Sequence, residues 1–199
     1  MNLNYRVLLL ILLFQPALVF CQQVPGTSIV NPSNVPATLC STGYLPPDVQ
    51  KRLAQDLKSW SVQQPQNLSE TARECWSSEK PLACPGITVG HFEHGKTTSY
   101  ALLLVSAGHT NPGYRFVMFT PERDGVSYDM TVLDEASDDA SDIFIHREDV
   151  AKFFDQKSIA KFRVDADELV LFADAGVKEY ETDVYFWGNG SFQHQPVDY

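Results

Sequence analysis

The longest uninterrupted hydrophobic run of the chain lies at its start. Residues 7–14 read VLLLILLF, follow a single cation, Arg6, and give way to Gln-Pro and then to a polar segment that begins at Gln22. A positive start, a short apolar core and a small residue before a polar stretch are the parts of a cleavable secretory signal. The core is shorter than the ~20 apolar residues that span a bilayer. We therefore predict a signal peptide at residues 1–21 and a mature chain without a transmembrane segment.

Cys21 is compatible with two kinds of processing. Val19 and Cys21 suit ordinary cleavage before Gln22, whereas a bacterial lipoprotein would keep Cys21 as its first residue and acylate it. Lipoprotein signals normally carry a small residue before that cysteine, and this chain has the bulky Phe20 there. The sequence therefore favours a secreted or periplasmic protein over one anchored by lipid.

The pattern changes twice between the signal and the strand-rich part of the chain. Residues 22–44 are rich in Pro, Ser, Thr and Asn and follow no period, which is typical of an extended lead-in or linker. A helix is then predicted to start at Pro46, with Pro65 ending the segment. Its apolar positions recur at steps of four, four and three, as on one face of an amphipathic helix: Val49, Leu53, Leu57 and Trp60.

From residue 100 onward the apolar positions follow the pattern of strands. The expected strands are 100–106, 114–120, 127–133, 143–145, 161–164, 168–172, 182–187 and 191–195, with a partly helical stretch at 148–160. An Asn-Gly step at 189–190, a strong hairpin signal, joins the last two strands. We therefore predict an α+β fold over residues 45–199, a single domain with an antiparallel, meander-like β-sheet and the N-terminal amphipathic helix packed on one face.

Charge narrows the classes of partner. The chain has 25 acidic and 15 basic residues and a formal net charge of −10, so its field repels phosphate backbones and anionic membrane surfaces. Nucleic acid is therefore excluded as a partner. A basic protein or a component of the cell envelope remains compatible with this charge.

Three cysteines follow the predicted cleavage point. Cys75 and Cys84 flank a short segment with turn residues, and a disulfide between them would close a small loop. Cys40 with either of the two is the competing pairing, and spacing alone does not choose between these alternatives.

One segment carries a resemblance to a known family. Residues 84–104 read CPGITVGHFEHGKTTSYALLL, which resembles a degenerate FG-GAP/VCBS-type unit and a segment of small secreted bacterial proteins of unknown function. In the FG-GAP/VCBS pattern, alternating oxygen side chains wrap a calcium ion and the next strand joins the core. The resemblance covers about 20 of 199 residues and implies this loop-and-strand shape.

The ligand positions of that pattern are poorly filled in this chain. They hold His91, Glu93, Gly95 and Ser99, whereas calcium takes six to eight oxygen ligands. We therefore expect no cofactor, with calcium at this loop as the alternative. His91, Glu93 and His94 also resemble zinc ligands in type, although they lack the helical spacing of a zincin motif.

Two further groups of residues are candidates for a site. The densest run of carboxylates could hold a hard cation: Asp134, Glu135, Asp138, Asp139 and Asp142. Late aromatic residues could bind a partner, because alternation puts Tyr185 and Trp187 on one face of a strand and Phe192 lies in the strand that follows.

These observations lead to two functional hypotheses. The first is an exported, non-enzymatic acidic domain that binds a protein or cell-envelope partner, similar by analogy to immunity or inhibitor proteins. The alternative is a metal-dependent hydrolase that uses the acidic run 134–142 or the loop 91–99. The sequence contains no recognisable catalytic constellation, which favours the first hypothesis.

Overall fold

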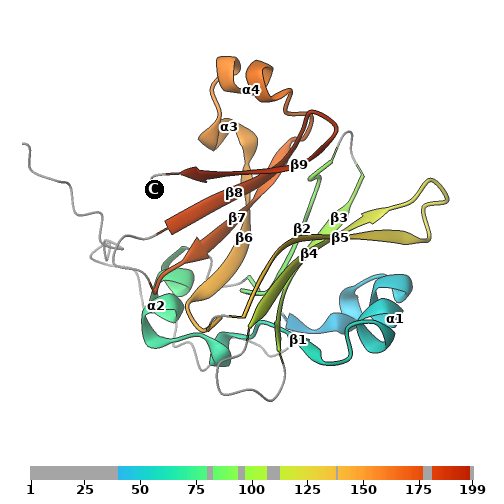
Figure 1. Ribbon diagram of the computed structural model, residues 1–199, viewed down its shortest axis with the longest axis vertical. Helices are drawn as coiled ribbons and strands as arrows, with labels where there is room; N and C mark the ends of the chain where they lie inside the picture. Colours follow the sequence, from blue (N-terminus) through green and yellow to red (C-terminus); the bar gives the residue numbers. More distant parts are fainter. Residues whose placement is uncertain are drawn as a thin grey trace, which may run out of the picture.

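The computed structural model describes residues 40–79, 83–93, 97–106, 113–137, 139–176 and 181–197, which form two antiparallel β-sheets (Figure 1). The first sheet contains β1 (Trp60–Val62), β2 (Ile87–Gly90), β3 (Ser99–Ser106), β4 (Tyr114–Pro121) and β5 (Tyr128–Ala136). Its order is β1-β3-β4-β5, and β2 also pairs with β3. The second sheet contains β6 (Ile143–Asp149), β7 (Glu168–Asp174), β8 (Glu181–Gly188) and β9 (Ser191–Val197), in that order.

The prediction of one meander-like sheet with a helix on one face is therefore wrong. The described residues are mostly β-structure, with nine strands in two sheets and a few short helices. The physical reason lies in β3 and β4, whose central residues are buried on both faces. A strand that is apolar on both faces needs a covering layer on each side, and a single short helix supplies only one.

The two sheets share an apolar core. Ala101, Leu103 and Phe116 of the first sheet cluster with Val170 and Tyr185 of the second. Aromatic rings meet edge-on here, with the centroids of Phe116 and Tyr185 4.9 Å apart. This interface fixes the position of one sheet against the other.

Helix α1 (Pro47–Gln55) covers the outer face of the first sheet (Figure 1). Val49 and Leu57 are buried there against Leu102 and Leu104 of β3. The predicted apolar stripe was too long, because the helix ends at Gln55 and Trp60 opens β1. The chain leaves the helix through a turn in which the N–H of Trp60 donates to the carbonyl of Leu57 at 2.8 Å.

Three other α-helices lie against the outer face of the second sheet. They are α2 (Glu70–Glu79), α3 (Val150–Phe153) and α4 (Gln156–Phe162). The described part of the chain also contains two 3-10 turns, η3 (Thr42–Tyr44) and η4 (Pro65–Asn67). Helix α4 takes the place of the strand predicted at 161–164, a prediction that is wrong. The helix ends at Arg163, which adopts the left-handed conformation with φ 48°.

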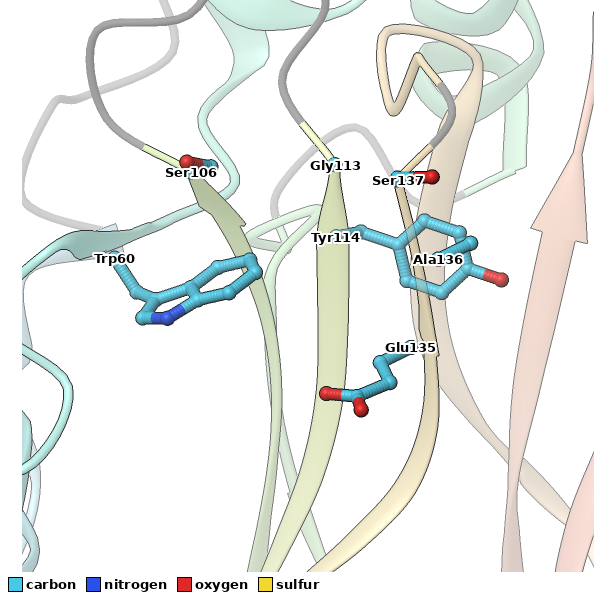
Figure 2. Close-up of a pocket in the computed structure, with 7 residues that line it drawn as sticks. All are labelled: Trp60, Ser106, Gly113, Tyr114, Glu135, Ala136 and Ser137. Atoms are coloured by element: carbon cyan, nitrogen blue, oxygen red, sulfur yellow. The ribbon is translucent and has the colours of Figure 1, made fainter.

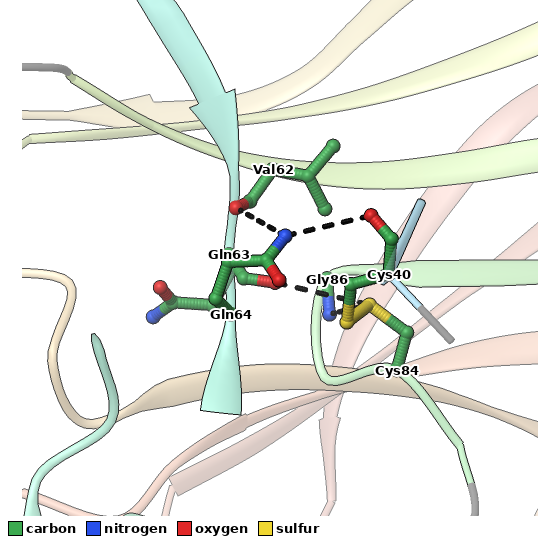
Figure 3. The surroundings of a disulfide bond; sticks show 6 residues. All are labelled: Cys40, Val62, Gln63, Gln64, Cys84 and Gly86. Atoms are coloured by element: carbon green, nitrogen blue, oxygen red, sulfur yellow. Dashed lines mark hydrogen bonds between the residues drawn. A yellow bond between two sulfur atoms is a disulfide. The ribbon is translucent and has the colours of Figure 1, made fainter. Parts of the chain in front are cut away.

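A disulfide joins Cys40 to Cys84, with Cα atoms 5.1 Å apart (Figure 3). The pairing of Cys75 with Cys84 is therefore wrong, and one of the alternatives is observed. Cys84 is buried in the cluster under α1, whereas Cys75 lies in the cluster between α2 and the second sheet. The two cysteines thus lie in different cores, which their short spacing in sequence does not reveal.

The predicted signal peptide and Cys21 lie outside the described residues. Among the residues that are described, no helix has the length and apolar character needed to cross a membrane.

Candidate functional site

The candidate site is an open hollow of about 500 Å³ at one end of the first sheet (Figure 2). Strands β1, β3, β4 and β5 all contribute to it, because Trp60 pairs with Ser106 across β1 and β3 and Tyr114 pairs with Ala136 across β4 and β5. The lining residues are Trp60, Ser106, Gly113, Tyr114, Glu135, Ala136 and Ser137. The hollow therefore combines an aromatic plane, hydroxyl groups and a carboxylate.

A guanidinium group links the two main features of the hollow. The Cζ atom of Arg115 lies 4.8 Å from the ring centroid of Trp60, within cation–π range. Nε and Nη2 of Arg115 both contact Oε2 of Glu135, at 2.9 and 2.8 Å. Figure 2 shows the indole of Trp60 and the carboxylate of Glu135 pointing toward one another across β4. Arg115 thus fixes a carboxylate whose side chain is still 57% exposed.

The wall of the hollow at Gly113 is tightly packed. A Cβ atom at Gly113 would lie 2.5 Å from the carbonyl oxygen of Ala136, closer than real Cβ contacts. The carbonyl of Gly113 accepts a hydrogen bond from Ser106 N–H at 3.0 Å. Only glycine therefore lets β4 start this close to the end of β5, and the hollow depends on that close approach.

The opposite face of β4 and β5 carries a polar cluster between the sheets. Tyr114 Oη donates to Oδ2 of Asp134 at 2.8 Å. Burial, followed by the charges of Asp134 and Asp183, raises the pKa of Tyr185 far above its ordinary range. The ring of His194 stacks on Tyr185 with centroids 5.6 Å apart. Tyr185 therefore remains a neutral phenol beside Asp134.

The acidic run does not converge on one point. Asp134 accepts from Tyr114, Glu135 pairs with Arg115, and Asp139 Oδ1 accepts Ser141 N–H at 2.9 Å. Asp142 accepts from the hydroxyl of Ser69, and Asp138 lies outside the described residues. Within the described ranges, no group of three or more His, Cys, Asp or Glu residues is arranged to hold a metal ion.

The loop that resembles a calcium unit is only partly described. The N–H of His91 donates to Oε2 of Glu168 at 2.7 Å, and Glu93 is half-buried. Ser99 opens β3 opposite Gly90, and its buried hydroxyl has no hydrogen-bond partner among the described residues. His94 and Gly95 lie outside the described residues.

The late aromatic residues share a face of the second sheet. Tyr185 is buried, whereas Trp187 and Phe192 are half-buried and meet edge-on with centroids 5.0 Å apart. The register pairs Trp187 with Phe192 across β8 and β9. Much of this aromatic surface therefore packs within the protein.

Sequence reasoning missed the hollow itself. The apolar period predicts Trp60 on a helix, and the strand pattern predicts Arg115 only as one residue of the strand 114–120. Their meeting depends on the register of β1, β3 and β4, in which Leu104 pairs with both Val62 and Arg115. The odd position of a cation in an otherwise apolar strand, YRFVMFT, was the one available signal.

Comparisons with known proteins give no relative. No family model, no curated protein and no solved structure matches this chain. The resemblance of residues 84–104 to FG-GAP/VCBS units therefore stays a prediction.

Proposed function

We propose that this protein is an exported acidic domain that binds a basic protein partner, with the hollow at Trp60 and Glu135 as its contact site. The main support for this contact site is that an aromatic plane and a fixed, 57% exposed carboxylate face the same hollow. Export is supported by the Cys40–Cys84 disulfide, because such bonds persist in oxidising compartments.

Arg115 of the protein itself shows how Trp60 and Glu135 can hold a cationic side chain. Its guanidinium stacks on Trp60 and pairs with Glu135 at the same time, so the two groups are spaced to hold a planar cation. Both Nε and Nη2 of Arg115 contact Oε2 of Glu135, and no described residue donates to Oε1. A lysine or arginine of a partner can therefore pair with Oε1 at the edge of the Trp60–Arg115 stack.

The net charge of −10 favours the same class of partner over long range. A field of this sign accelerates encounter with a basic protein and slows encounter with an acidic one, and added salt weakens both effects.

Affinity capture tests this proposal. The mature chain is immobilised and exposed to extracellular and envelope fractions at low and high salt, beside Glu135→Gln and Glu122→Gln, the latter removing an exposed carboxylate at the β4–β5 hairpin. The expected result is a basic protein that is retained at low salt and that, once purified, binds Glu135→Gln at least fivefold more weakly than Glu122→Gln. Retention of no protein at low salt, or equal binding by both variants, would contradict the proposal.

A further inference from the structure

The outer edge of β5 runs along one side of the first sheet and ends at the hollow. Its partner on the inner side is β4, and no strand in the described part of the chain pairs with its other side. The second sheet has an edge at β9, but that strand contains Pro196, which lacks a donor and is typical of an edge that avoids pairing. β5 contains neither proline nor lysine.

The register identifies the backbone groups that face outward. The N–H of Glu122 donates to the carbonyl of Ser127 at 2.8 Å, which closes the β4–β5 hairpin with a hydrogen-bonded pair. Hydrogen-bonded and non-bonded pairs alternate in an antiparallel ladder, so Tyr128, Met130 and Val132 direct their backbone N–H and C=O groups away from β4. The N–H of Tyr128 indeed leaves the sheet and donates to Oδ2 of Asp48 at 3.0 Å.

Helix α1 closes the start of this edge. Asp48 accepts the N–H of Tyr128 and is held by Arg52, whose Nε lies 3.5 Å from the same carboxylate oxygen. No comparable contact reaches the backbone of Met130 or Val132 from any described residue. The edge is thus capped at Tyr128 and available from Met130 toward the hollow.

We propose that this edge is where an extended, basic segment of the partner adds as a further strand, an inference that rests on the proposed function. Strand addition gains affinity from main-chain hydrogen bonds and specificity from alternate side chains. The exposed carboxylates of Asp129 and Glu135 flank Val132, whose side chain is 42% exposed. Val132 and Glu135 lie on the same face of β5, because they pair with Val117 and Arg115, which are two positions apart on β4. A segment with cationic residues at alternate positions presents them all to this face, where their stems cover Val132 and one of them delivers a cation to the hollow at Glu135.

The same charges disfavour a second copy of the chain as the occupant. An antiparallel β5–β5 pair centred on Val132 would place Asp129 of one copy opposite Glu135 of the other. Like charges directly opposite one another destabilise a strand pair. A self-paired dimer is therefore an alternative outcome of the test and not the expected one.

Amide hydrogen exchange with a blocked eight-residue peptide of alternating lysine and valine tests the inference. We expect the peptide to slow exchange at Met130 and Val132 at least tenfold, and a glutamate–valine peptide of the same length to have no effect. Val132→Pro removes one outward donor and is expected to weaken binding at least tenfold. Val132→Lys adds a like charge at the edge and is expected to do the same, whereas Val126→Lys, at the 73% exposed hairpin tip, changes affinity by less than twofold.

Each other outcome overturns the inference. Binding of the lysine–valine peptide that is lost in Glu135→Gln but leaves β5 unprotected removes strand addition and keeps the proposed function. Absence of binding also removes strand addition, and the affinity capture then decides the proposed function separately. Protection of β5 that rises with protein concentration without peptide assigns the edge to a second copy of this chain.

Discussion

Gln63 is a buried side chain on which the junction of the two sheets depends. Its Nε2 donates to the carbonyls of Ala140 and Ile143, at 2.7 and 3.1 Å, and its backbone N–H donates to Leu103 at 2.9 Å. The same residue therefore holds β3 of the first sheet and the start of β6 in the second. Gly86 packs so closely here that a Cβ atom would lie 2.5 Å from the carbonyl oxygen of Gln63.

Replacing Gln63 by leucine is expected to lower the free energy of unfolding by about 1–3 kcal/mol, because two buried carbonyls lose their donor. The matched control is Gln64→Leu, whose amide makes longer contacts of 3.5 and 3.2 Å to Cys40 and Val62. That control is expected to cost about 0–1 kcal/mol. Urea unfolding of the two variants provides the comparison, and an equal loss in both would contradict the role of Gln63.

The burial of Tyr185 predicts that the free energy of unfolding falls at alkaline pH. Its folded pKa is raised by burial and then by Asp134 and Asp183, whereas the unfolded chain has the ordinary pKa of about 10. A folded pKa above the unfolded one gives stability that is complete below about pH 10 and is lost as pH rises further. Tyr185→Phe is therefore expected to lose less stability than the parent protein between about pH 10 and 11. Tyr44→Phe, at an exposed position, is the control and keeps the parent slope.

At the scale of elements, the Cys40–Cys84 disulfide ties the segment before α1 to the turn before β2. It joins residues 44 positions apart, so its removal frees a large loop in the unfolded chain. We expect the Cys40→Ala/Cys84→Ala double variant to be about 2–4 kcal/mol less stable in denaturant unfolding. Peptide mapping of the unreduced protein should recover the Cys40–Cys84 crosslink, and recovery of a Cys75–Cys84 crosslink would contradict the structure.

Individual elements were more predictable from sequence than their assembly. The Asn-Gly hairpin was predicted from local chemistry and is confirmed, with positive φ at Asn189 (53°) and Gly190 (81°). The apolar run of β3 was likewise predicted as a buried strand and is buried. β1 has only three residues and β2 only four, which is too few for a strand period to show. Trp60 of β1 was therefore predicted as part of the apolar stripe of the helix.

The partition into two sheets had no local signal. It depends on the chain leaving β5 at Ala136 and starting β6 at Ile143 in another sheet. The contacts that fix this step, such as those of Gln63, join residues about eighty positions apart. The candidate site was hidden for the same reason, because Trp60, Arg115 and Glu135 meet only through the register of separate strands.

For the whole molecule, the arrangement of the described carboxylates predicts that calcium does not change the thermal stability. Those of the acidic run each have a separate partner, and no metal-binding group is found within the described ranges. Adding about 5 mM calcium is therefore expected to change Tm by less than about 1 °C, since an ion that binds only the folded state would raise it. A rise of several degrees that EDTA reverses would instead assign an ion to the acidic run or to the loop 91–99.

The central claim is that the hollow binds a cationic side chain, and an NMR titration tests it most directly. The indole N–H signal of Trp60 is followed while N-acetyl-arginine amide is added, with N-acetyl-citrulline amide as the neutral analogue of the same shape. We expect a saturable shift with arginine, none with citrulline, and loss of the shift in Glu135→Gln but not in Asp129→Asn. Equal shifts with arginine and citrulline, or a Trp60 signal that does not move when arginine is added, would show that the hollow does not bind a cationic side chain.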